Sequence, residues 1–496
     1  MFDYLKKILE QVSQINDEID DYKSLSPSGA MPSVAQVNKA LKLLRKNKIE
    51  EAEKLLLEAE VLYPTNEVVF RTLGYVYEAQ REFEKAIKYF KKAIELNPIK
   101  KDLFMRLGYA QLSIRRNEDA KKTFEQALKI FKSDSEVITG YGMALYRLER
   151  FEEARKEFVK AFSLDAHNLN ALFLTATIDV MFKEYDRAET RLSLLVKVAP
   201  STAHLYEYAK LKKLKADYEE AETLALKSLS TNKNFLPAYL LLAEINQLQL
   251  KFDDALKWIK RAENEELFTP ALYLAKANVC MYKEDFQSAI EAYDKVLEFE
   301  QNETVDLKIL VCKIMLDESV QLSEELAQQV QKEENVEKKA VLYMLLGIWN
   351  YKNNDLKLAE RYLKNALQIT LKLPVVYYVL AKIYKSFGDK YKTEKYFELA
   401  LEKNPYSYDA YKDFIEFYIE NGDFENAKFK IKKVLKLFNE DTYFENLLFH
   451  VSFQLLNERS SEYNVKELIK LAEKLEEKSS FLYADEKNAL IEKTRG

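Results

Sequence analysis

A repeat of 34 residues is the feature of this sequence that most limits its fold. The segment FRTLGYVYEAQREFEKAIKYFKKAIELNP begins at Phe70, FMRLGYAQLSIRRNEDAKKTFEQALKI begins at Phe104, and a third similar segment begins at Ile138. Small and aromatic residues recur in register in all three segments. Sequence periods of roughly 20 to 50 residues are typical of chains that stack one structural unit after another. The sequence therefore predicts a repeat architecture.

A glycine in each of these three segments indicates close packing between helices. Gly74 lies among bulky apolar residues in a segment of good helix formers, although glycine in a helix interior costs about 1 kcal/mol relative to alanine. A residue without a side chain offsets this cost if it lets a neighbouring helix approach. Because Gly108 and Gly142 fall in the same register, we interpret this as a packing position from which large side chains are excluded.

The repeat closely resembles the tetratricopeptide repeat. That family places a bulky residue at the fourth position, leucine then glycine or alanine at the seventh and eighth, and an aromatic residue at the eleventh. It continues with alanine at the twentieth, an aromatic residue at the twenty-fourth, alanine at the twenty-seventh and proline at the thirty-second. The copy at residues 67–100 has every one of these, namely Phe70, Leu73, Gly74, Tyr77, Ala86, Phe90, Ala93 and Pro98. The resemblance implies two antiparallel helices in each copy.

Twelve copies follow this frame, starting at residues 33, 67, 101, 135, 169, 202, 236, 270, 304, 340, 374 and 408. We therefore predict an all-α fold, a right-handed superhelical solenoid of about twelve tetratricopeptide-like helix pairs with terminal capping helices. Rare residues support the frame. Gly388 and Gly422 fall where a first helix should end, which suits a left-handed cap. Pro237, Pro270 and Pro374 fall where a first helix should begin.

The two ends of the chain depart from the repeat, so we divide it into residues 1–32, 33–441 and 442–496. Residues 1–32 are predicted as an acidic amphipathic helix and a linker, and residues 442–496 as C-terminal capping helices, two in number. The first segment could fold back as a cap, mediate self-association through residues 2–22, or dock to a partner. Its apolar residues are spaced by three and four, as in a coiled-coil seam: Leu5, Ile8, Val12, Ile15, Ile19 and Tyr22.

Composition and motifs argue against several classes of function. The three histidines lie far apart in the sequence, and none belongs to a metal-binding motif. The nine glycines do not cluster into a glycine-rich loop that could bind phosphate. Cys280 and Cys312 are too few for a zinc site and are expected to be buried and reduced. Acidic residues outnumber basic ones, 81 to 76, whereas nucleic-acid-binding proteins usually show a basic excess. We predict a protein that is not an enzyme and uses no metal or cofactor, with no nucleic acid as partner.

The sequence also predicts no direct insertion into a membrane, because it has no apolar stretch of about 18 residues. No secretory signal is visible at its start. We expect a cytoplasmic protein.

The resemblance implies that the first helices line a concave groove that binds a protein or peptide. Side chains at the second, fifth, ninth, twelfth and thirteenth positions commonly face such a groove, and tyrosine and arginine are enriched in binding hot spots. The predicted groove residues are Arg71, Tyr75, Arg106, Tyr109, Tyr146, Arg147, Phe173, Tyr206, Lys210, Lys213, Asn278, Tyr378, Lys382 and Lys385. Each could instead only cover the neighbouring helix.

Two functions fit this reading. The first is an interaction scaffold or adaptor that binds a partner protein, for example in a secretion, pilus or motility assembly. The alternative is a regulatory peptide receptor whose superhelix changes pitch on binding. The residues themselves select neither a partner nor a particular assembly.

Overall fold

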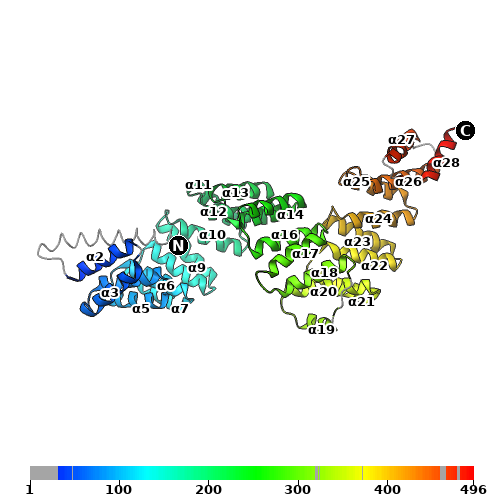
Figure 1. The fold of residues 1–496 in the computed structure, drawn as a ribbon. Helices are drawn as coiled ribbons and strands as arrows, with labels where there is room; N and C mark the ends of the chain where they lie inside the picture. Colours follow the sequence, from blue (N-terminus) through cyan, green and yellow to red (C-terminus); the bar gives the residue numbers. More distant parts are fainter. Residues whose placement is uncertain are drawn as a thin grey trace. The chain divides into compact units, whose positions relative to one another are not determined.

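The computed structural model describes residues 32–46, 48–318, 322, 324–370, 373–458, 465–477 and 481–495. Within these residues the chain forms 27 helices and no strand, as predicted, and consecutive helices pack in adjacent antiparallel pairs (Figure 1). The chain divides into two compact units at residues 224 and 225. The acidic segment predicted at the N-terminus lies outside the described residues, apart from its last position.

The first unit contains the helix pairs up to residue 224. Its helices are α2 (Pro32–Arg45), α3 (Ile49–Leu62), α4 (Glu67–Ala79), α5 (Phe83–Leu96), α6 (Lys101–Ser113), α7 (Asn117–Ile130), α8 (Ser135–Arg147), α9 (Phe151–Leu164), α10 (Leu169–Met181), α11 (Tyr185–Val198) and α12 (Thr202–Leu214). Helix α13 (Tyr218–Thr231) begins in this unit and ends in the second.

The second unit continues the same alternation of helices. Its helices are α14 (Leu236–Leu248), α15 (Phe252–Asn264), α16 (Pro270–Tyr282), α17 (Phe286–Leu297), α18 (Glu303–Met315), α19 (Glu324–Lys332), α20 (Val336–Lys352), α21 (Leu356–Ile369), α22 (Pro374–Ser386), α23 (Lys390–Lys403), α24 (Tyr408–Glu420), α25 (Phe424–Val434), α26 (Thr442–Glu458), α27 (Val465–Glu477) and α28 (Ala484–Arg495).

The turn inside eleven of the twelve repeat copies uses one left-handed residue. Gly388 and Gly422 have φ of 72° and 71°, which confirms the predicted caps. The following amide closes the turn on the carbonyl five residues earlier, as Asp389 does on Tyr384 at 3.1 Å. Nine other copies have a residue with a side chain in the same left-handed conformation, namely Arg81, Arg115, Glu149, Lys183, Ala216, Leu250, Glu284, Asp317 and Asn354. The three prolines expected to open first helices also lie in the first turn of α14, α16 and α22.

The glycines at the eighth position are closely packed, as the sequence predicts, and in the copies at residues 67, 101 and 135 the group packed against them is an aromatic ring. A Cβ atom added to Gly74 would lie 2.5 Å from a ring carbon of Phe90, which is closer than real Cβ contacts allow. Gly142 faces Phe158 in the same way. Close packing of helix backbone against ring is therefore what offsets the helix-breaking cost of glycine.

Two parts of the chain differ from the predicted pattern. In the copy expected at residues 304–339 the second helix, α19, has only 9 residues. The C-terminal region has three described helices, α26, α27 and α28, where two were predicted.

The two cysteines are buried, as expected: Cys280 and Cys312 are free and form no disulfide with each other. Burial raises the pKa of Cys280 to about 11, so its thiol stays protonated.

Candidate partner-binding surfaces

Two of the predicted groove residues in the first unit are buried by their own neighbours. Only 4 % of Arg71 is exposed, and its Nε lies 3.1 Å from a carboxylate oxygen of Glu67. Tyr75 is 7 % exposed, and its hydroxyl donates a hydrogen bond of 2.5 Å to Asp102. Burial and the adjacent Asp102 carboxylate raise the pKa of Tyr75. Both side chains therefore shape the surface more than they extend from it.

Arg106 ties these groups together. Its guanidinium lies over the Tyr75 ring, 4.4 Å from the centroid, and bonds to Glu78 at 2.7 Å and to Asp102 at 3.2 Å. Burial raises the pKa of Glu78, although Arg106 counters this effect. Arg106, Glu78 and Asp102 already form hydrogen bonds with one another. A binding partner that covers them would therefore remove less hydration than it would from unpaired charges.

Tyr109, Tyr146 and Arg147 offer more surface. Tyr109 is 38 % exposed, and the edge of its ring packs on Phe124 with centroids 5.7 Å apart. Tyr146 is half-buried, with its ring edge-on to Phe151 at 5.3 Å. The side chain of Arg147 is exposed. These three side chains are more accessible than those of Arg71 and Tyr75.

The remaining predicted residues of the first unit lie on α10 and α12. The Phe173 ring lies 5.2 Å from the ring of His204. Lys210 lies over the Tyr206 ring at 5.3 Å and also binds Glu207 at 2.9 Å. Lys213 is partly exposed on the same helix.

In the second unit the structure separates Asn278 from the three other predicted residues. Asn278 lines a cavity, whereas Tyr378, Lys382 and Lys385 do not. The Tyr378 hydroxyl donates to Asp413 at 2.8 Å, and Lys382 pairs with the same carboxylate at 3.2 Å. Lys385 pairs with Glu420 at 2.8 Å. The last three side chains thus join α22 to α24.

The cavity has a volume of about 570 Å³ and lies among α16, α18, α20 and the start of α22. Its wall is largely apolar, and Lys308 and Glu337 form an ion pair of 2.9 Å at its edge. Such a cavity, apolar with a few polar groups, is typical of binding sites. Most of this wall was not predicted from the sequence; it consists of Gln247, Asn278, Met281, Tyr282, Glu284, Lys308, Val336, Glu337, Ala340, Val341, Met344, Ile369, Thr370, Leu373, Pro374 and Val375.

Glu284 connects this cavity to a distant part of the second unit. It is the left-handed residue between α16 and α17, and its carboxylate accepts a hydrogen bond of 2.6 Å from the hydroxyl of Ser407, 123 residues later. The ring of Phe252 meets Tyr406 edge-on with centroids 5.9 Å apart. A repeat that contacts only its neighbours would not make these contacts.

Burial raises the pKa of Glu284 to about 7, although hydrogen bonds from Ser407 and Asn404 lower it. The folded chain therefore holds a proton at pH values where the unfolded chain has released it. The stability that this group contributes is complete below about pH 4.5 and is lost as the pH rises towards 7.

We expect Glu284→Gln to stabilise the protein relative to the wild type by about 1–2 kcal/mol more at pH 8 than at pH 4.5, because the variant has no carboxylate to ionise. Urea unfolding of both proteins at the two pH values measures this difference. Glu300→Gln, at an exposed carboxylate, serves as the control. If the free energies of unfolding of the variant and the wild type differ by the same amount at both pH values, the raised pKa of Glu284 would be contradicted.

A second arrangement, which was not predicted from the sequence, joins three of the repeats to the preceding one. The Tyr77 hydroxyl donates to Glu53 of the preceding copy at 2.7 Å, and its ring stacks on Tyr89 with centroids 5.4 Å apart. The equivalent rings of Tyr384 and Tyr396 stack with centroids 5.2 Å apart. Tyr384 and Tyr418 repeat the hydrogen bond with Glu360 at 2.5 Å and Glu394 at 2.6 Å. The tyrosine occupies the eleventh position and the glutamate the twenty-first.

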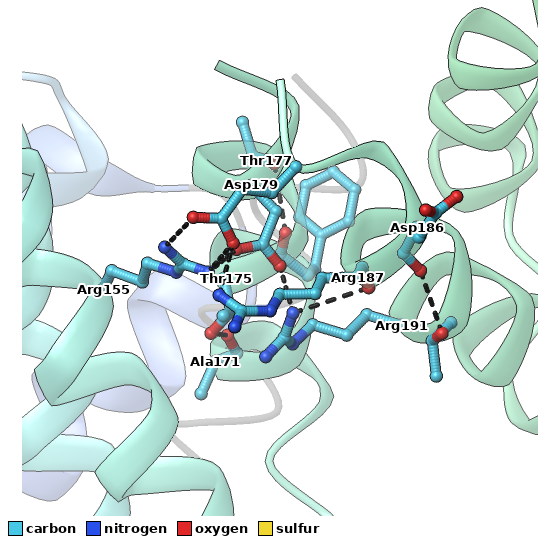
Figure 2. A network of polar contacts seen from close by, with 11 residues as sticks. Arg155, Ala171, Thr175, Thr177, Asp179, Asp186, Arg187 and Arg191 are labelled. Carbon is cyan, nitrogen blue, oxygen red and sulfur yellow. Dashed lines mark hydrogen bonds and ion pairs between the residues drawn. The ribbon is translucent and has the colours of Figure 1, made fainter. Parts of the chain in front are cut away.

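The copy at residue 169 has different residues at these positions. Asp179 replaces the tyrosine, Arg155 replaces the glutamate, and Arg191 replaces the stacked ring. Asp179 is fully buried, and Figure 2 shows the two arginines reaching it from two sides. Arg155 Nη2 lies 2.6 Å from its carboxylate, and Arg155 also binds Glu184. Burial raises the pKa of Asp179, and the Arg191 and Arg155 guanidiniums counter this effect.

The described residues contain no group of three or more histidine, cysteine, aspartate or glutamate side chains that could hold a metal ion. None of the helices in this described part is long and apolar enough to cross a membrane.

Comparisons with known proteins agree with this geometry. A family model of the tetratricopeptide repeat matches residues 135–168, 270–303 and 375–406. A model of the N-terminal tetratricopeptide-repeat region of Psidin matches residues 28–141. No curated protein sequence matches the chain.

Several solved structures are similar to parts of the chain. A tetratricopeptide repeat protein from Parabacteroides merdae is 17 % identical and aligns over 50 % of this chain and 98 % of its own, with a TM-score of 0.41. PilF of Pseudomonas aeruginosa is 19 % identical over 43 % of this chain and 97 % of its own, with a TM-score of 0.37. YrrB, described as having an unusual peptide-binding site, is 18 % identical and aligns over 37 % of this chain and 95 % of its own, with a TM-score of 0.30.

Proposed function

This chain is a tetratricopeptide-repeat protein, and from that premise we propose that it is a scaffold that binds a segment of a partner protein through the first helices of its repeats. Such repeats generally mediate protein–protein interactions. The observation that carries the proposal is the cavity of about 570 Å³ in the second unit. Asn278, Met281 and Tyr282 line it from the ninth, twelfth and thirteenth positions of one first helix.

The chemistry of this cavity favours an apolar side chain of the partner. Met344 and Val341 are almost fully buried in its wall, and Val336, at its rim, is 66 % exposed. An apolar anchor in a desolvated pocket with a polar rim is the usual form of a binding hot spot. Asn278 could orient the partner backbone, since its amide offers both donors and an acceptor. We include a cytoplasmic location and membership of a secretion, pilus or motility assembly in the proposal.

The test is a charge placed at the cavity rim. Val336→Glu should weaken partner binding at least tenfold, about 1.4 kcal/mol, because a carboxylate there must be desolvated. Val336 is the first residue of α20, where an acidic side chain suits the helix dipole, so stability should be unchanged. Val61→Glu, at a valine 80 % exposed in α3, is the control.

The measurement is quantitative affinity capture with all three proteins, followed by titration of the captured partner. Partners lost with Val336→Glu and kept with Val61→Glu would support the proposal. Equal capture by both variants would exclude this cavity as the binding site.

The alternative function, a receptor that changes pitch on binding, is favoured by the contact between Glu284 and Ser407. This contact borders the cavity, so an occupant could strain or relax it. A change in the small-angle scattering profile when the captured segment is added would favour the receptor over a static scaffold.

A further inference from the structure

A hollow on the second helices of the first unit offers a separate binding site. Its volume is about 380 Å³, and it lies between α9 and α11 with α10 beneath it. The wall combines the apolar side chains of Val159, Phe162, Leu172 and Leu194 with the guanidiniums of Arg187 and Arg191. No acidic side chain lines it. This surface is separate from the binding surface of the proposed function, because that surface is formed by the first helices of the repeats.

The exchange of residues in this copy gives the hollow its chemistry. In the copies at residues 67 and 374 two stacked tyrosines occupy the eleventh and twenty-third positions. Here these positions hold Asp179 and Arg191, so an ion pair replaces two apolar rings. Asp179 is fully buried and fixes Arg191 at the wall (Figure 2). A guanidinium held in this way needs little further ordering to bind an anion.

Both arginines of the wall retain hydrogen-bond donors. Arg191 contacts Asp179 and the Arg187 carbonyl through Nη1, and Arg187 contacts Glu184 through its own Nη1. A guanidinium has five N–H donors in a fork that matches a carboxylate. Val159 and Leu194 are 44 % and 41 % exposed, so apolar surface lies open beside these donors. The hollow therefore suits an apolar side chain with carboxylates next to it.

The chain itself contains a segment with this chemistry. We propose that the acidic N-terminal segment, residues 2–22, docks in the hollow between α9 and α11. Ile19 belongs to its apolar seam, and Asp17, Glu18, Asp20 and Asp21 surround it in the sequence. One apolar side chain with four carboxylates close by matches an apolar hollow with two guanidiniums. The occupant is the segment of the same chain, because a tethered segment has an effective concentration near the millimolar range, which a second copy does not reach at ordinary protein concentrations.

The test is a disulfide between the two surfaces in the full-length chain. Ile19→Cys combined with Leu194→Cys should cross-link under a mild oxidant at least ten times faster than Ile19→Cys combined with Val61→Cys. Val61 is more exposed than Leu194, 80 % against 41 %, and is closer to the segment in sequence, so chance encounter favours the control pair. Cys280 and Cys312 are buried and should contribute little. A cross-linked product that migrates as a monomer on a non-reducing gel would support this assignment, and a product that migrates only as a dimer would overturn it.

A charge exchange then tests the chemistry of recognition. Arg187 is 64 % exposed, so Arg187→Glu should keep the fold, as circular dichroism can verify, and slow cross-linking at least fivefold. Adding Asp20→Lys and Asp21→Lys should restore the rate. Equal rates for the Leu194 and Val61 pairs, or no effect of the charge exchange, would overturn the proposal.

Discussion

Replacing Asp179 by asparagine should lower the free energy of unfolding by about 2–4 kcal/mol, because removing one partner of a buried ion pair leaves the other charges uncompensated. Asp179 is fully buried between Arg155 and Arg191. The arginines are 18 % and 25 % exposed, so they can partly turn to water, which keeps the loss from being larger. Urea unfolding measures the change.

The tyrosine copies supply the control for this prediction. Tyr384→Phe removes the equivalent hydrogen bond to Glu360 and should cost about 1.5 kcal/mol, the lower end of the range for a hydrogen bond to a charged group, because no buried charge loses an ion-pair partner. The triple exchange Asp179→Tyr, Arg155→Glu and Arg191→Tyr installs the arrangement of the copy at residue 374 and should recover most of the loss. A change below about 0.5 kcal/mol for Asp179→Asn would show that the cluster does not stabilise the fold.

The second large effect is expected at Gly108. Three ring carbons of Phe124 would lie within 2.8 Å of a Cβ atom added there, and the same holds for Gly140 on the next first helix. The ring is thus held between two glycines and cannot move away. Gly108→Ala should destabilise the protein by about 1–3 kcal/mol through overpacking, and Gly108→Leu should cost considerably more.

Two variants separate packing from backbone effects. Gly142→Ala should cost less than Gly108→Ala, because Phe158 faces one glycine and not two. Adding Phe124→Leu to Gly108→Ala should recover stability, since the copy at residue 169 uses Ala176 and Leu192 at these positions. Chemical denaturation of the four variants tests both statements. Equal or higher stability of Gly108→Leu than of the wild type would refute the steric explanation.

The repeats could be predicted from the sequence because their determinants are local. Gly388 and Gly422 take the left-handed conformation where a first helix must stop, and Pro270 and Pro374 open first helices where a missing N–H costs nothing. Such features depend on a few neighbouring residues and recur in each copy. The short helix α19 and the third C-terminal helix, α28, lie where the repeat weakens, and there the periodic pattern gave less information.

The binding residues were harder to predict. Position in the repeat places a side chain on a first helix, but its exposure depends on what the next copy contributes. Tyr75 is covered because Asp102 and Arg106 of the following copy reach it. The cluster around Asp179 had a signal in the sequence: a carboxylate at an aromatic position, with arginines at the two positions that contact it.

The sequence by itself determined the helix pairs, their turns and the close packing at the glycine positions, because a 34-residue period makes neighbouring copies meet in the same way each time. Only the tertiary structure decided the cavity in the second unit and the contact of Glu284 with Ser407. That contact joins residues 123 apart. Its formation depends on the small rotation added by every repeat between them, and no single copy of the sequence specifies that sum.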